Sequence, residues 1–178
     1  MPTITVFGNS AALPASASYA EGVRFGRRLA EAGYVVATGG YAGLMEAASL
    51  GAREAGGHTI GITVPNVFPD RGSANAHVVE ERQAASLMER IGELIESSDG
   101  VIVLDGSIGT FTELIAAWNL AFVAKFSGAS PKPIIAVGSG WAKLIEKLAD
   151  ELKTDASLVT CVSTVGDALG ALERQLQG

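Results

Sequence analysis

Residues 101–110, Val-Ile-Val-Leu-Asp-Gly-Ser-Ile-Gly-Thr, decide the fold of this chain. They begin with an uninterrupted apolar run, Val101–Leu104, and continue into a turn that contains glycine. Beyond the turn, apolar side chains recur at helical spacing in Leu114, Trp118 and Phe122. A strand that is apolar on both faces and leads through a short turn into a helix predicts a buried parallel strand with its crossover helix.

The same pattern recurs along the whole chain, because short β-branched runs alternate with longer segments of helical spacing. Together with Val101–Leu104, the expected strands are Thr3–Phe7, Val35–Thr38, Thr59–Val64, Ile134–Val137 and Leu158–Val162. Alternation of this kind predicts an α/β fold, a Rossmann-like doubly wound parallel sheet in three α/β/α layers with right-handed crossovers. No repeat or linker interrupts it, so residues 1–178 are expected to form a single nucleotide-binding domain.

Composition excludes several classes of protein. The chain of 178 residues has a formal net charge of −6 and no cluster of basic residues, which argues against nucleic acid as a partner. The N-terminal residues lack the pattern of a signal peptide, and no apolar stretch is long enough to cross a membrane, so a cytoplasmic protein without a membrane partner is expected. The single cysteine, Cys161, excludes a disulfide framework and is expected to be a small buried apolar residue.

Glycine-rich turns follow four of the expected strands, and they supply the candidate binding residues. Parallel strands place their carboxyl ends at one edge of a sheet, where amides of the following helices attract anions. A phosphate-bearing ligand is therefore expected there, although each glycine alone is explained by a tight turn. The turns are Gly8-Asn9-Ser10, Gly39-Gly40-Tyr41-Ala42-Gly43-Leu44-Met45, Asp105-Gly106-Ser107-Ile108-Gly109-Thr110 and Gly138-Ser139-Gly140.

The segment Thr110-Phe111-Thr112-Glu113 allows two interpretations. In the first, Thr110 caps a helix and Glu113 reaches back to the Thr110 amide, as in a capping box. In the second, the Glu113 carboxylate faces the anion-binding turn, where it stabilises a developing cation or positions water. One side-chain conformation cannot serve both roles.

Two motifs carry a resemblance to a known family. Gly39-Gly40-x-x-Gly43-Leu44-Met45 and Gly106-x-x-Gly109-Thr110-x-x-Glu113 resemble the LONELY GUY family, formerly called lysine decarboxylase-like. The family motif reads P-G-G-x-G-T-x-x-E and is preceded by a helix with M-x-x-R-K. An ungapped count places Arg90 on the family arginine and Glu113 on the family glutamate.

The resemblance implies hydrolysis of the N-glycosidic bond of a nucleoside 5′-monophosphate to free base and ribose 5-phosphate, without a cofactor. It implies Arg90 and Glu113 as catalytic residues, a phosphate held by Thr110 and the glycine turns, and a homodimer. Three residues depart from the motif: Asp105, Ser107 and Ile91 stand in place of proline, glycine and lysine. The alternative is a noncatalytic nucleotide or molybdenum-cofactor carrier of the same fold.

The remaining candidates favour structural roles. His58 and His77 lack metal-ligand spacing, so no metal site is expected. Arg82, beside two glutamates, is expected to be a solvated charge at a helix start. Tyr41 is left between stacking on a base and simple surface exposure. Trp118, Phe122 and Phe126 form a helical stripe expected in the core or in a subunit interface.

Overall fold

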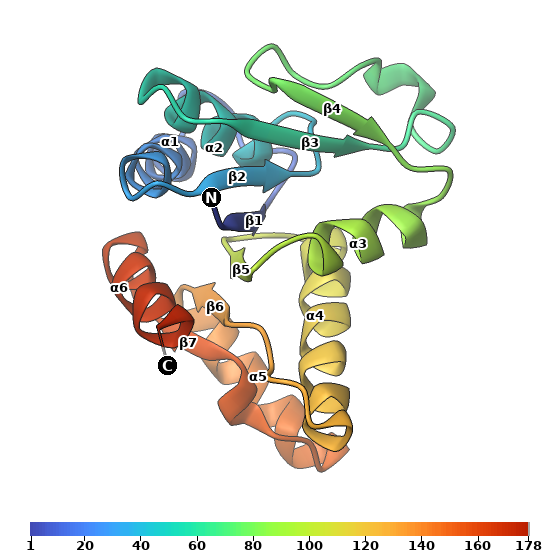
Figure 1. The fold of residues 1–178 in the computed structure, drawn as a ribbon, viewed down its shortest axis with the longest axis vertical. Helices are drawn as coiled ribbons and strands as arrows, with labels where there is room; N and C mark the ends of the chain where they lie inside the picture. Colours follow the sequence, from blue (N-terminus) through green and yellow to red (C-terminus); the bar gives the residue numbers. More distant parts are fainter. Residues whose placement is uncertain (178) are drawn as a thin grey trace.

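The computed structural model describes residues 1–177 and contains one sheet of seven parallel strands in the order β4-β3-β2-β1-β5-β6-β7 (Figure 1). This is the predicted doubly wound Rossmann-like architecture. The chain reverses its direction of progress along the sheet between β1 and β5, which are hydrogen-bonded neighbours. The strands are β1 Thr3–Phe7, β2 Val35–Thr38, β3 Thr59–Thr63, β4 Glu80–Gln83, β5 Gly100–Val103, β6 Ile134–Val137 and β7 Thr160–Val162.

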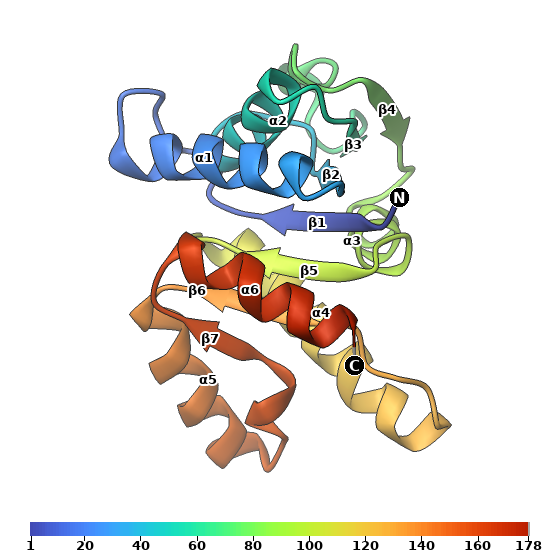
Figure 2. The same ribbon diagram turned by 60° about the vertical axis from the view of Figure 1, so that its left-hand side comes forward.

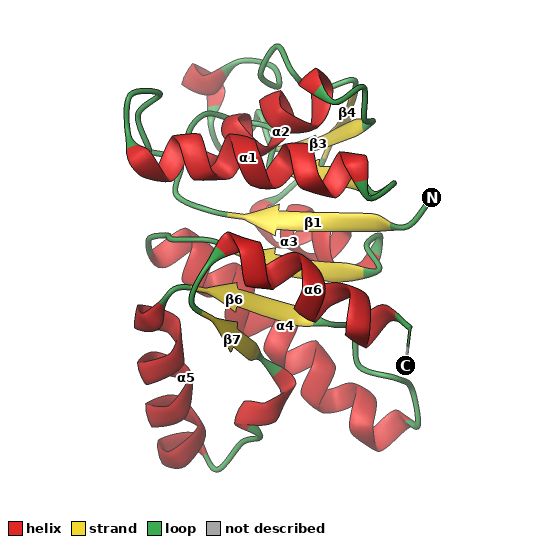
Figure 3. Cartoon of the chain, turned by 90° about the vertical axis from the view of Figure 1, so that its left-hand side faces the viewer, coloured by secondary structure: helices red, strands yellow, loops and turns green. Residues whose placement is uncertain are grey.

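Helices cover both faces of the sheet and complete the three layers (Figures 2 and 3). One apolar cluster joins the sheet to α1, α2 and α6, and a second joins it to α3, α4 and α5. The helices are α1 Ala17–Glu31, α2 Leu44–Glu54, α3 Leu87–Glu96, α4 Ile108–Ser127, α5 Ser139–Leu152 and α6 Val165–Leu176, with 3₁₀ turns at Pro69–Arg71 and Ala156–Leu158.

Alternation along the central strands explains why their sequences are apolar throughout. Val101 and Val103 of β5 pack into the cluster below α4, whereas Ile102 packs into the opposite cluster. All three side chains are fully buried. Because both faces of the strand are covered, the sequence shows a continuous apolar run in place of alternation with polar residues.

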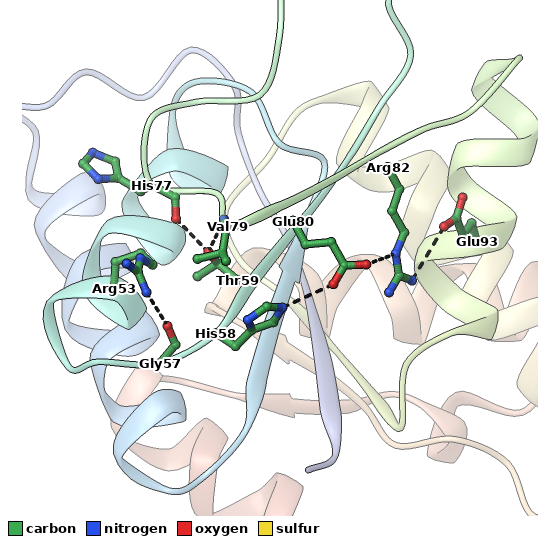
Figure 4. A network of polar contacts seen from close by, with 9 residues as sticks. All are labelled: Arg53, Gly57, His58, Thr59, His77, Val79, Glu80, Arg82 and Glu93. Carbon is green, nitrogen blue, oxygen red and sulfur yellow. Dashed lines mark hydrogen bonds and ion pairs between the residues drawn. The ribbon is translucent and has the colours of Figure 1, made fainter.

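One of the seven strands, β4, was not predicted from the sequence. It lies at an edge of the sheet. Its sequence, Glu-Glu-Arg-Gln, is charged and has no apolar pattern. Arg82 therefore lies in a strand, and the expected helix start at this residue is wrong. Its guanidinium contacts Glu80 at 2.7 Å and Glu93 at 3.8 Å, and His58 contacts Glu80 at 3.3 Å (Figure 4). Charged side chains of this kind protect an edge strand against pairing with other chains.

Helix α4 begins earlier than a capping box at Thr110 requires. Ser107 is its N-cap residue, and the Phe111 amide donates to the Ser107 carbonyl at 3.0 Å, so Thr110 lies within the first turn. The capping-box interpretation is therefore wrong. Thr110 is instead buried against Gly106, and Glu113 is turned toward a buried arginine, so the two residues do not form a capping box.

The aromatic stripe lies in the core at Trp118, its role in an interface stays a prediction, and the burial expected for Cys161 is corrected in part. The aromatic stripe of α4 divides, since Trp118 is buried and donates its indole N–H to the Asp155 carbonyl, whereas Phe126 is 77% exposed. Cys161 is only half-buried, because it lies near the sheet edge in β7.

Within residues 1–177, no helix combines the length and apolarity that crossing a membrane requires, and no metal-binding group of three or more acidic, histidine or cysteine side chains occurs.

Candidate functional site

A cavity of about 220 Å³ opens where the turns after β1 and β5 meet, beside the N-terminus of α4. This position lies outside the carboxyl ends of the two strands at which the sheet changes direction, where open α/β sheets bind ligands. Its walls come from β1, the β3–β4 connection, α2, α3 and α4. The lining residues are Val6, Phe7, Gly8, Ser10, Met45, Phe68, Arg71, Leu87, Arg90, Ile91, Ser107, Gly109, Thr110, Thr112 and Glu113.

Main-chain hydrogen bonds hold three of the four glycine turns together at this cavity. The Asn9 amide donates to the Asp105 carbonyl at 2.9 Å, and the Asn9 carbonyl accepts from the Leu44 amide at 2.9 Å. Gly43 has a φ of 74°, and a Cβ there would lie 2.7 Å from Ser10 Cα. The close approach of these two turns therefore depends on glycine. The fourth turn, after β6, lines a different hollow with Asp105.

Arg90 is the buried cation of the cavity. It lies in the first turn of α3 and is only 5% exposed. Its Nε donates to the Ile62 carbonyl at 2.7 Å, and its Nη2 donates to the Gly39 carbonyl at 3.0 Å. A Cβ at Gly39 would lie 2.7 Å from Arg90 Cζ, so this glycine makes room for the guanidinium. Burial lowers the pKa of Arg90, but an arginine side chain keeps its charge in proteins.

Glu113 faces Arg90 across the cavity. Its Oε1 lies 3.5 Å from Arg90 Nη1, and its side chain is almost fully buried. Burial raises the pKa of Glu113 to about 7, and the neighbouring charge of Arg90 opposes this rise. The contact is longer than a charge-assisted hydrogen bond, so the carboxylate is not engaged in a tight, bidentate pair. A carboxyl group that titrates near neutral pH can exchange protons during a reaction.

The first turn of α4 supplies donors to the same cavity. The amides of Ile108, Gly109 and Thr110 precede the first residue that can donate within the helix, and Ser107 and Gly109 line the cavity. A helix N-terminus attracts anions through these amides and through its dipole. Asp105, the acidic departure from the motif, does not line this cavity, so its carboxylate does not face an anion bound there.

The structure brings most of the predicted site residues together. The cavity is lined by Arg90, Glu113, Gly8, Ser10, Met45, Ser107, Gly109 and Thr110. The other predicted residues, Gly39, Gly40, Gly43 and Gly106, are absent from the lining. Each of them packs closely on a neighbouring element, and a Cβ on Gly40 would lie 2.8 Å from Thr63 Cγ2. These four glycines therefore allow the elements behind the cavity wall to pack closely.

A second hollow of about 310 Å³ adjoins the first and shares Ser10 and Arg71 with it. Its other lining residues are Tyr41, Ala42, Glu46, Ser73 and Asn75. Tyr41 is only 3% exposed, so simple surface exposure is wrong for this residue. Its hydroxyl accepts a hydrogen bond from the Val64 amide at 2.8 Å, and Phe68 contacts its ring edge to face.

Sequence reasoning missed two prominent residues of the cavity. Phe68 and Arg71 come from the β3–β4 connection, in which the sequence predicts no site residue. Arg71 places its guanidinium over the Phe68 ring at 4.2 Å and over the Tyr41 ring at 5.2 Å. The only local signal was an arginine that follows Pro69 and Asp70, and such a signal does not identify a binding residue by itself.

The fold and this cavity define a Rossmann-like α/β protein with a cavity at the switch point of its sheet. The chain belongs to the SLOG cluster4 family, whose model matches residues 1–167. It is 33% identical over 99 residues to the cytokinin riboside 5′-monophosphate phosphoribohydrolase of Mycobacterium tuberculosis, and these residues are 56% of this chain and 50% of the relative. The resemblance seen in the sequence is thereby confirmed, although the match spans only half the length of that relative.

Solved structures show the same fold over nearly the whole chain. The molybdenum cofactor binding protein of Rippkaea orientalis superposes with a TM-score of 0.76 at 26% identity, covering 97% of this chain and 96% of the other. The molybdenum cofactor carrier protein of Chlamydomonas reinhardtii superposes with a TM-score of 0.74 at 26% identity, covering 99% of both chains. The chain is thus similar both to a hydrolase and to carriers.

Proposed function

We propose that this protein hydrolyses the N-glycosidic bond of a nucleoside 5′-monophosphate and releases the free base and ribose 5-phosphate. The observation that carries the proposal is the buried pair of Arg90 and Glu113 beside the free amides of α4. A cation, a carboxyl group that titrates near neutral pH and an anion-binding helix end meet in one cavity. The likeness to a phosphoribohydrolase supports the same reaction.

The phosphate of the substrate is assigned to the N-terminus of α4. Ser107, Gly109 and Thr110 line the cavity there. Binding energy from a nonreacting phosphate can hold the ribose in the reactive position, which raises the rate beyond what affinity alone provides. The departure at Ser107 adds a hydroxyl donor to this part of the wall.

Glu113 is assigned to the reacting centre. Cleavage of an N-glycosidic bond develops positive charge on the ribose ring, as in other glycosyl hydrolyses. An ionised Glu113 stabilises that cation or orients the attacking water, and Arg90 orients the carboxylate and fixes substrate charge. Because burial raises the pKa of Glu113 to about 7, base release is expected to rise with pH through this value.

The rival function is that of a noncatalytic carrier. It is favoured by the likeness to molybdenum cofactor proteins over nearly the full length of the chain, and by Ile91, which lines the cavity where the family motif has lysine. A carrier would use the same phosphate-binding wall without turnover.

Incubation of the purified protein with a panel of nucleoside monophosphates separates these two functions. An enzyme releases free base, which chromatography detects, whereas a carrier returns the nucleotide unchanged. Glu113→Gln keeps the shape of the side chain and removes its charge, so base release is expected to fall about 100-fold or more. Glu151→Gln, at an exposed position of α5, is the matched control. Binding without release by the wild-type protein would favour the carrier.

A further inference from the structure

We propose that Arg71 is the cation that binds the phosphate group of the ligand, together with the N-terminus of α4. This inference rests on the proposed site and adds to it a residue from the β3–β4 connection. Arg71 lines both hollows and forms the boundary between them together with Ser10.

The surroundings of Arg71 hold its guanidinium in place without using its hydrogen-bonding capacity. The planar group lies over the rings of Phe68 and Tyr41. A cation–π contact uses the charge of the guanidinium, so its N–H donors remain available to a ligand. Within residues 1–177, the guanidinium is held by these two aromatic contacts, and its charge acts on that of Arg90.

The connection that carries Arg71 is fastened at both ends. Before it, the Phe68 amide donates to the Val64 carbonyl at 3.1 Å. After it, the Ala74 amide donates to the Glu81 carboxylate at 3.2 Å, and the Asn75 side chain donates to the carbonyls of Gly40 and Tyr41, both at 3.0 Å. The short exposed segment between these anchors therefore presents Arg71 at a fixed place.

Charge in the cavity points to an anionic ligand. Three charged side chains line the first hollow, and two of them, Arg90 and Glu113, form a pair. Arg71 is the remaining charge, so the cavity is net positive although the chain as a whole carries −6. Arg71 also lines the second hollow, whose other charged side chain is Glu46, so the positive excess belongs to the first hollow.

A phosphate monoester fits these donors better than a carboxylate. Arg71 shares the cavity with Ser107, Gly109 and Thr110 at the end of α4. Donors from two separate elements suit a tetrahedral group with three terminal oxygens, and the arginine fork binds two of them at once. The predicted ligand class is therefore a phosphomonoester, whose phosphate lies between Arg71 and the first turn of α4.

The test is calorimetric binding of AMP and adenosine, two probes that differ only in the phosphate. Measurements are made with Glu113→Gln as the parent protein, so that AMP is not consumed. Adding Arg71→Ala is expected to weaken AMP binding about 10- to 100-fold, the effect of losing charged hydrogen bonds, and to change adenosine binding less than about threefold. Arg71→Lys is expected to be intermediate, because it keeps the charge and loses the fork. Arg24→Ala, which removes an exposed arginine of α1, is the control.

Two results would overturn the assignment. If Arg71→Ala weakens AMP and adenosine equally, the residue packs against the nucleoside or supports the loop and does not bind phosphate. If the parent protein binds AMP no more tightly than adenosine, the cavity has no phosphate site. Base release by the wild-type protein is measured separately. Absence of release together with phosphate-dependent binding would refute the proposed hydrolysis and leave the role of Arg71 intact.

Discussion

Replacement of Glu113 by glutamine should change how the stability of the protein depends on pH. In the folded protein, burial raises the pKa of Glu113 from 4.5 to about 7. A raised pKa means that the folded state binds this proton more tightly than the unfolded state does. The stabilisation is therefore fully present below pH 4.5 and is lost as pH rises through about 7. Glutamine is neutral throughout and lacks this dependence.

The expected magnitude follows from the two pKa values. At about 1.4 kcal/mol for each tenfold change in proton affinity, the rise from 4.5 to about 7 is equivalent to about 3 kcal/mol of unfolding free energy. The stability difference between Glu113→Gln and wild type should therefore shift by about 3 kcal/mol in favour of the variant between pH 4.5 and 8.5. For a domain of this size, about 3 kcal/mol corresponds to roughly 6–12 °C in melting temperature.

Thermal unfolding at half-unit pH steps measures this difference directly. At each pH, the melting temperature of the wild type is subtracted from that of the variant. The difference removes the contribution of every group that titrates alike in both proteins. Glu151→Gln, which removes an exposed carboxylate from α5, should retain the pH dependence of the wild type. If Glu113→Gln and wild type stay parallel from pH 4.5 to 8.5, the carboxyl group does not titrate in a buried environment, and the expected rise of base release through about pH 7 loses its basis.

Three further predictions concern the frame of the site and the assembly. Gly39→Ala should displace the Arg90 guanidinium, lower stability by about 1–3 kcal/mol and reduce base release, which unfolding and activity assays measure. Tyr41→Phe should cost about 1–3 kcal/mol in urea unfolding, because the buried Val64 amide loses its acceptor; an unchanged midpoint would show that water replaces the hydroxyl. The protein is expected to be a homodimer in light scattering, and Phe126→Glu should yield monomers if this exposed residue of α4 lies in the interface.

The sheet was largely predictable because its central strands are buried on both faces and are apolar without interruption. Val101–Leu104 differs from the observed β5 by one residue at each end. The missing strand, β4, has no such signal, since an edge strand is partly solvated and carries charges. Its pairing with β3 makes these residues a strand.

The site was predictable where a motif places a side chain on regular structure. Arg90 and Glu113 lie on two helices that pack against the same sheet, and they meet as the motif implies. The start of α4 was misjudged because both Ser107 and Thr110 are acceptable N-cap residues by sequence, and tertiary burial of Thr110 decides between them. Arg71 was missed because its position depends on anchors at distant residues.

The fastening of the turns by Asn9 has a consequence for how this site can evolve. Both of its bonds to neighbouring turns use peptide groups only, so they place no demand on the side chains at Asp105 and Ser107, whereas the close approach of the turns still requires glycine at Gly43. Substitutions such as those at Asp105 and Ser107 can therefore accumulate while the scaffold is inherited unchanged. Proteins with this fold can gain or lose catalytic turnover through a few substitutions in the turns. Hydrolases and carriers can therefore descend from one ancestral backbone.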